Sequence, residues 1–174
     1  MKRTAKLILC ASALLTTLFI TSCGKDDDES GPSYEFIDQN LQGTIDGQAF
    51  DFGEGEAELT TNFDEEQVLA LDLFDSNEEI TDICEFFGFG DQVSVFFSIT
   101  PEVGLYPLSF NANSFTGQTV TLFNPDGAVN NISTEGAVEI LSISDTQVRG
   151  RIDARFDSEN NVNGNFTATF CTEE

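Results

Sequence analysis

Histidine and tryptophan are both absent from the 174 residues, and tyrosine occurs only twice, at Tyr34 and Tyr106. Without histidine, Ser-His-Asp and Cys-His catalytic arrangements and histidine-bearing metal sites are excluded. Glycosidases need two carboxylates, but the acidic residues here are too numerous for one pair to stand out. The rings that usually stack on sugars are also scarce. We therefore expect a protein that is not an enzyme.

Basic residues are scarce as well: 7 Lys and Arg stand against 31 Asp and Glu, for a formal net charge of −24. All 31 acidic residues but only four basic ones follow residue 22, which leaves that part of the chain near −27. Such a surface repels nucleic-acid phosphates, so nucleic acid is not an expected partner. Strong acidity can indicate disorder, but 16 of the 17 Phe follow residue 22 and alternate with polar residues. We expect a folded domain.

A short positive stretch opens the chain, carried by Lys2, Arg3 and Lys6. Residues 7–20 follow without charge and are mostly apolar, a run shorter than the roughly 20 residues of a spanning helix. The run ends in Ile20-Thr21-Ser22-Cys23, an aliphatic and two small residues before a cysteine, which is the pattern of the bacterial lipobox. The pattern predicts a helical signal peptide over residues 1–22 and a lipid on Cys23. An ordinary secretory signal with an incidental cysteine is the alternative.

The residues after Cys23 are Gly, Lys, three Asp, Glu, Ser, Gly, Pro and Ser, so residues 23–33 are expected to be a disordered acidic tether. The segment from Ile20 to Glu29 resembles the N-termini of lipoproteins of the Bacteroidota. In that group, a Lys/Ser-plus-acidic run after the lipidated cysteine directs export to the outer leaflet of the outer membrane. The resemblance implies an outer-membrane lipoprotein at the cell surface. An anchor that faces the periplasm is the alternative.

From residue 41 onward the apolar residues recur at every second position, which is typical of strands. We expect strands over residues 41–45, 48–52, 67–74, 83–89, 92–99, 105–110, 118–123, 137–143, 148–156 and 162–170. Turn residues separate them, such as Asp46-Gly47, which suits a type I′ hairpin. Residues 64–67 are the one expected helical turn. The pattern predicts a single all-β domain over residues 34–174, an antiparallel β-sandwich or barrel of about ten short strands.

The closing strands also resemble those of small uncharacterised β-rich lipoproteins of the Bacteroidota. The residues that carry this likeness are Glu135-Gly136-Ala137-Val138-Glu139-Ile140, Gly150-Arg151-Ile152-Asp153-Ala154-Arg155-Phe156 and Asn163-Gly164-Asn165-Phe166. The resemblance implies a fold class and no activity.

Two of the four cysteines are accounted for, because Cys10 leaves with the signal peptide and Cys23 receives the lipid. Cys84 and Cys171 remain, and an oxidising compartment favours a disulfide between them. Two buried thiols that never meet are the alternative. A bridge at Cys171 would also fix the last strand.

Arg149, Arg151 and Arg155 are the candidate ligand-binding residues. Their odd numbers put them on one face of a strand together with Asp153, as the domain's one basic patch. Guanidinium groups bind carboxylate or phosphate through paired hydrogen bonds. The alternative is that they pair with acids of neighbouring strands, such as Glu139 across the preceding hairpin.

Asp157, Glu159, Asn161 and Asn163 are the candidate calcium ligands, since oxygen donors alternate along this segment. The segment departs from the EF-hand pattern because it lacks glycine at the sixth position and glutamate at the twelfth. A polar hairpin turn explains the same residues without a metal.

Phenylalanine gathers in Phe86-Phe87-x-Phe89 and in Phe96-Phe97. Adjacent residues of a strand point to opposite faces, so both faces are apolar there. One face is expected to belong to the core, and the other to line a lipocalin-like cavity or a partner surface. A central strand that is buried on both sides explains the same residues without a ligand.

These observations together predict a membrane-anchored lipoprotein that acts as a non-enzymatic binding or accessory module. A lipocalin-like carrier of a small hydrophobic ligand and a calcium-stabilised adhesive domain are the alternatives. The expected partners are the membrane, through the N-terminal lipid, and a protein, a glycan or a small hydrophobic ligand. No cofactor is expected, with Ca²⁺ as the one alternative.

Overall fold

The computed structural model describes residues 33–77, 80–86, 92–114, 116–127 and 129–172. The predicted signal peptide, Cys23 and nearly all of the predicted tether lie outside these residues. Among the described residues, no helix is both long and apolar enough to cross a membrane.

The described residues are all-β, as predicted: they form ten strands and one short 3-10 helix, η1. The strands are β1 (Gln42–Ile45), β2 (Gln48–Thr61), β3 (Gln67–Asp75), β4 (Ser94–Ile99), β5 (Gly104–Pro107), β6 (Val120–Asn124), β7 (Val129–Ser133), β8 (Glu135–Ile143), β9 (Gln147–Arg155) and β10 (Asn161–Cys171). The helix η1 (Ile83–Glu85) lies between β3 and β4.

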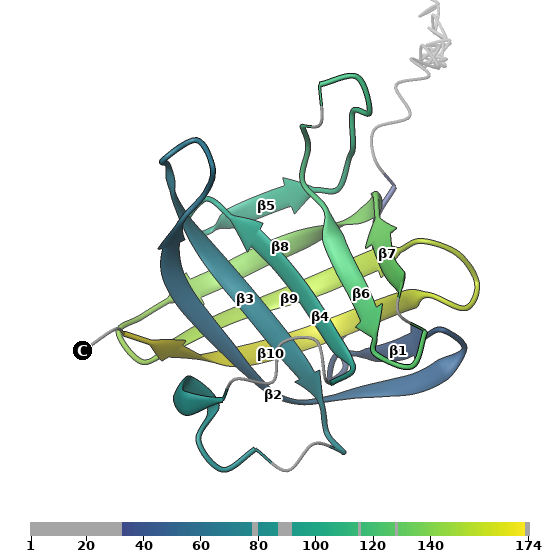
Figure 1. The fold of residues 1–174 in the computed structure, drawn as a ribbon, viewed down its shortest axis with the longest axis horizontal. Coiled ribbons are helices and arrows are strands. Elements are labelled where there is room, and N and C mark those ends of the chain that lie inside the picture. The colour runs from purple at the N-terminus through teal and green to yellow at the C-terminus, as the bar shows by residue number, and fades with distance from the viewer. Residues whose placement is uncertain (1–32, 78–79, 87–91, 115, 128, 173–174) are drawn as a thin grey trace, which may run out of the picture.

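All ten strands belong to one curled sheet, in the order β5-β8-β9-β10-β1-β2-β3-β4-β6-β7. In Figure 1, β8, β9 and β10 form one wall of a half-barrel, and β3, β4 and β6 cross in front of it. The long strand β2 turns the corner between the walls. Its first half pairs with β1, and its second half pairs in parallel with the end of β10, from Thr169↔Glu56 to Cys171↔Glu58. The other neighbouring strands are antiparallel.

The first hairpin forms as the sequence predicts. Asp46 and Gly47 have φ values of 51° and 71°, the left-handed pair that a type I′ turn requires. A second glycine allows the hairpin to reach β10, because a Cβ at Gly43 would lie 2.0 Å from the carbonyl oxygen of Asn161. The first strand is therefore fixed against the last one.

The core lies between the two walls. Leu71, Val95 and Ile152 are among its fully buried side chains, and the rings of Phe97 and Phe166 meet edge to face with centroids 6.2 Å apart. Burying side chains of this size stabilises the fold by about 1.5–3 kcal/mol each. Phe96, next to Phe97, points to the opposite face of β4 and is only partly buried. Inward-facing side chains of both walls belong to one packed cluster.

The structure differs from the expected strands in three places. Residues 83–85 form η1 and no strand, because the Asp82 carboxylate accepts the Cys84 amide hydrogen at 3.1 Å and begins a helical turn; the rest of that predicted strand reaches residues outside those described. The second strand continues to Thr61, past the predicted end at 52. Strand β7 was not predicted, since its inward side chains include the polar Asn131 and Ser133.

Candidate functional site

Strand β9 presents the predicted arginine face. Val148, Ile152 and Ala154 point into the core, and the odd-numbered positions between them point outward. Arg149, Arg151, Asp153 and Arg155 therefore share the outer face of β9, as predicted from their spacing. They differ, however, in what covers them.

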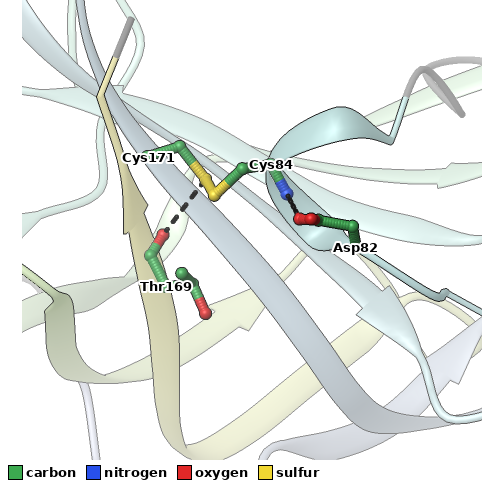
Figure 2. The surroundings of a disulfide bond; sticks show 4 residues. All are labelled: Asp82, Cys84, Thr169 and Cys171. Atoms are coloured by element: carbon green, nitrogen blue, oxygen red, sulfur yellow. Dashed lines mark hydrogen bonds between the residues drawn. A yellow bond between two sulfur atoms is a disulfide. The ribbon is translucent and has the colours of Figure 1, made fainter. Parts of the chain in front are cut away.

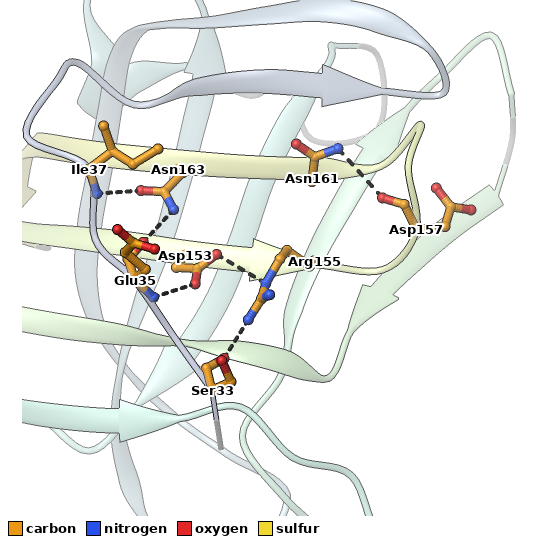
Figure 3. Close-up of polar contacts among 8 residues, drawn as sticks. All are labelled: Ser33, Glu35, Ile37, Asp153, Arg155, Asp157, Asn161 and Asn163. Atoms are coloured by element: carbon orange, nitrogen blue, oxygen red, sulfur yellow. Dashed lines mark hydrogen bonds and ion pairs between the residues drawn. The ribbon is translucent and has the colours of Figure 1, made fainter. Parts of the chain in front are cut away.

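Residues 33–41, called here the N-terminal strap, lie over this outer face. The strap crosses from β9 to β10. Its end lies parallel to β10 and joins it through backbone hydrogen bonds, from the Leu41 amide to the Asn165 carbonyl and from the Asn165 amide to the Gln39 carbonyl, each 2.8 Å. Asn163 adds a side-chain clamp: its Oδ1 accepts the Ile37 amide hydrogen at 2.9 Å, and its Nδ2 donates to the Glu35 carbonyl at 2.8 Å. The strap therefore belongs to the folded domain (Figure 3).

Arg155 and Asp153 also hold the strap. Arg155 donates to the Ser33 carbonyl and lies 3.3 Å from the Asp153 carboxylate (Figure 3). The other oxygen of Asp153 accepts the Glu35 amide hydrogen at 2.9 Å, and only 3% of the Asp153 surface is exposed. These two side chains are thus occupied by contacts within the domain.

Arg151 pairs with Glu139, the cross-strand partner that the sequence offered as the alternative to a ligand. Its guanidinium also lies over the ring of Phe36 in the strap, 4.4 Å from the ring centroid. A cation over an aromatic face is attracted to the ring electrons. Arg151 therefore connects β8, β9 and the strap.

Arg149 remains exposed on the same face. Within the described part of the chain its guanidinium forms no ion pair and no hydrogen bond, in contrast to Arg151 and Arg155. It borders a cavity of about 720 Å³, the Arg149 cavity, at the junction of the strap, β2, β8, β9 and β10. The lining residues are Asp38, Asn40, Phe52, Gly53, Leu141, Arg149, Gly150, Arg151, Asn165, Phe166 and Thr167.

The Arg149 cavity combines one free guanidinium with neutral polar groups, the Asp38 carboxylate and the paired Arg151. Thr167 faces Arg149 across the β9–β10 ladder, and Asn40 and Asn165 supply amides. Asp38 accepts a hydrogen bond from the Asn165 Nδ2 at 2.9 Å, which fixes both side chains. A planar guanidinium can donate two parallel hydrogen bonds to one carboxylate or phosphate. Hydroxyl groups of the same ligand would find donors and acceptors beside it.

Among the four candidate calcium ligands, the side chains of Asp157, Asn161 and Asn163 form hydrogen bonds with different parts of the domain. Asp157 accepts hydrogen bonds within its own turn, from the Glu159 amide and from the Asn160 side chain. The Asn161 side chain donates to carbonyls of that turn, whereas Asn163 holds the strap farther along β10 (Figure 3). No group of three or more Asp, Glu, His or Cys side chains with metal-binding geometry occurs among the described residues.

Cys84 and Cys171 form a disulfide, with their Cα atoms 5.5 Å apart. The bond joins η1 to the end of β10, across β2 (Figure 2). The predicted pairing is thus present in the structure, where it attaches the last residue of β10 to η1.

A pair of outward-facing carboxyl groups on the opposite wall was missed from the sequence. Glu56 of β2 and Asp72 of β3 are cross-strand partners. Burial, with added repulsion from Asp72 and Glu58, raises the pKa of Glu56 to about 7. Burial and the nearby Glu58 raise the pKa of Asp72 to about 6. The alternation Glu54, Glu56, Glu58 is the sequence signal, but it lies beyond the predicted end of the second strand.

No known family model matches the chain, and neither the curated proteins nor the solved structures contain a match to it.

Proposed function

We propose that this chain is a lipid-anchored lipoprotein of the outer membrane, displayed at the cell surface, and that it acts as a non-enzymatic binding module. The lipobox that ends at Cys23 and the resemblance of residues 20–29 to Bacteroidota lipoproteins support the anchor. One observation supports the site: Arg149 is an exposed cation, without a partner among the described residues, at a cavity of about 720 Å³.

The proposed ligand is a small hydroxyl-bearing molecule with one carboxylate or phosphate group. Arg149 would bind the anionic group, and Asn40, Asn165 and Thr167 would bind the hydroxyls. The negative charge of the whole domain opposes the entry of an anion, but at physiological salt this field decays over about 8 Å. Within the cavity, the Asp38 carboxylate already accepts a hydrogen bond from Asn165, and the Arg149 guanidinium is the charged donor left to contact the anion.

The ligand proposal is tested by titration calorimetry on the mature chain with three probes: glucuronate, glucose 6-phosphate and glucose. We expect one of the two anionic probes to bind and glucose to bind more weakly, and which anion binds separates carboxylate from phosphate. Arg149→Gln removes a charged donor, so we expect it to weaken binding by a factor of about 10 to 100.

Gln147→Ala is the matched control, because Gln147 is exposed on the same face of β9 and does not line the cavity. It should bind the anion as the unchanged chain does. Equal affinity of Arg149→Gln and the unchanged chain, or no binding of either anion, would overturn the assignment of the cavity.

The anchor is tested separately by labelling growing cells with radioactive palmitate. We expect the chain to incorporate label and Cys23→Ala to incorporate none. External protease should digest the domain in intact cells if it is displayed at the surface. A labelled chain that is protected until the cells are broken would place the domain on the periplasmic side.

A further inference from the structure

The β2–β3 hairpin extends beyond the rest of the sheet. Its two strands stay paired up to Thr61↔Gln67, whereas β4 leaves β3 at Leu69↔Ile99 and β10 leaves β2 at Cys171↔Glu58. Residues 59–68 thus have no other described strand beside them, and Figure 1 shows the hairpin projecting from one end of the half-barrel.

The turn at the tip is held in one conformation by its own hydrogen bonds. The Asn62 Oδ1 accepts amide hydrogens from Asp64 at 3.0 Å and from Glu66 at 2.9 Å. The Asn62 amide donates to the Glu66 carbonyl at 2.9 Å, and Glu65 adopts a left-handed φ of 62°. A turn that is already ordered loses little conformational entropy when it binds a partner.

This ordered turn presents a fully exposed aromatic side chain. The exposed fraction of Phe63 is 108%, against 53% for Phe156 and 47% for Phe110. Single exposed apolar residues are common on protein surfaces. Phe63 differs because it stands at the end of a projecting, ordered turn, where it can enter a pocket of another molecule. Aromatic anchors of this kind carry much of the binding energy of protein interfaces.

The charges around Phe63 indicate what the pocket must look like. The three residues that follow it, Asp64, Glu65 and Glu66, are all exposed. Their carboxylates would repel an acidic surface on a partner. Anionic lipid headgroups are disfavoured for the same reason. A second copy of this chain is also strongly acidic, with a formal charge of −24 over its full length.

We propose that the β2–β3 hairpin tip is a protein-docking element, in which Phe63 enters an apolar pocket rimmed by Lys and Arg residues on a different protein. This site is distinct from the Arg149 cavity, none of whose lining residues belongs to the tip. The acidic residues accelerate the encounter and set the orientation, and Phe63 supplies the contact that is buried.

The test starts in the cells that make the protein, with the full chain carrying a photoreactive benzoyl-phenylalanine at position 63. The same group at position 156, an exposed aromatic site outside the hairpin, is the matched control. We expect one protein adduct from position 63 that the control lacks. Lipid adducts, adducts with a second copy, or the same adducts from both positions would overturn the proposal.

The cross-linked protein is then purified and its binding to the mature chain is measured by calorimetry. We expect Phe63→Ala to weaken binding about tenfold or more and Phe156→Ala to leave it unchanged. Replacing Asp64, Glu65 and Glu66 by their amides should weaken binding at low salt and flatten its salt dependence. If Phe63→Ala binds the partner as tightly as the unchanged chain does, the proposal is overturned. The melting temperature of each variant is the folding control and should equal that of the unchanged chain.

Discussion

Two carboxyl groups on the outer face of β2 and β3, those of Glu56 and Asp72, are expected to make the stability of the domain depend on pH. Glu56 and Asp72 face each other, and Glu58 lies close enough to repel both. The Oδ1 of Asp72 is buried and has no hydrogen-bond partner among the described residues. Ionising such a group costs free energy in the folded chain but not in the unfolded one.

We expect the free energy of unfolding to fall as the pH rises from about 4 to above 7. The pKa values of Glu56, about 7, and Asp72, about 6, lie above their usual values, 4.5 and 3.8. The stability that the protonated groups contribute is therefore complete at low pH and lost as the pH passes the folded-state pKa. Urea unfolding of the disulfide-bonded domain at several pH values measures the slope.

The double variant Glu56→Gln, Asp72→Asn should flatten this slope and raise the stability at pH 8 by about 1–2 kcal/mol, allowing for solvent screening. Glu135→Gln, at an exposed position of β8, is a suitable control and should leave the slope as it is. A double variant with the slope of the unchanged chain would contradict the explanation.

The strap is the element on which the candidate site depends. It supplies Asp38 and Asn40 to the Arg149 cavity, and the same strap occupies Arg155 and Asp153. Arg155 is occupied by the strap, and Arg151 by Glu139 of β8 and Phe36 of the strap, whereas Arg149 has no such partner among the described residues. Loosening the strap should change both the stability and the cavity.

Asn163→Ala tests this dependence, because it removes the two hydrogen bonds between the Asn163 side chain and the strap. We expect a loss of about 1–2 kcal/mol in the free energy of unfolding. Hydrogen exchange at the Ile37 amide should become faster, and anion binding at Arg149 should weaken. Asn130→Ala on β7, whose side chain is exposed, is the control. Unchanged exchange at Ile37 would show that the clamp does not hold the strap.

Local patterns were enough to predict most strands and the outward face of β9. The alternation of apolar and polar residues predicted β3, β9 and β10, and the dipeptide Asp46-Gly47 predicted the first turn. The strap could not be predicted, because Glu35 and Ile37 meet partners more than 115 residues away, and no local pattern records such a contact. The Arg149 cavity was missed for the same reason: its lining comes from five separate parts of the chain.

At the scale of the whole molecule, one covalent bond closes most of the domain. Cys84 and Cys171 are 87 residues apart in the sequence. Closing a loop of that size restricts the unfolded chain and, by loop entropy, stabilises the fold by about 4–5 kcal/mol.

The double variant Cys84→Ser, Cys171→Ser should therefore unfold at a much lower urea concentration than the oxidised chain. Reductant should bring the unchanged chain to the same midpoint and have no effect on the double variant. If the oxidised chain and the double variant unfold together, the bond does not stabilise the domain.

Because the first strand pairs with the last one, this part of the sheet can be completed only when the whole chain is present. The strap rests mainly on β10, and β1 has only its hairpin with β2, until nearly the whole chain has been made. Cys171, the last bonded residue, appears at the same late moment. Contacts between distant parts of a chain form slowly, and exposed strand edges are prone to aggregate while they wait. A chain that lacked β10 would lose the neighbour of the strap and of one edge of β1, so its beginning as well as its end would be held less firmly.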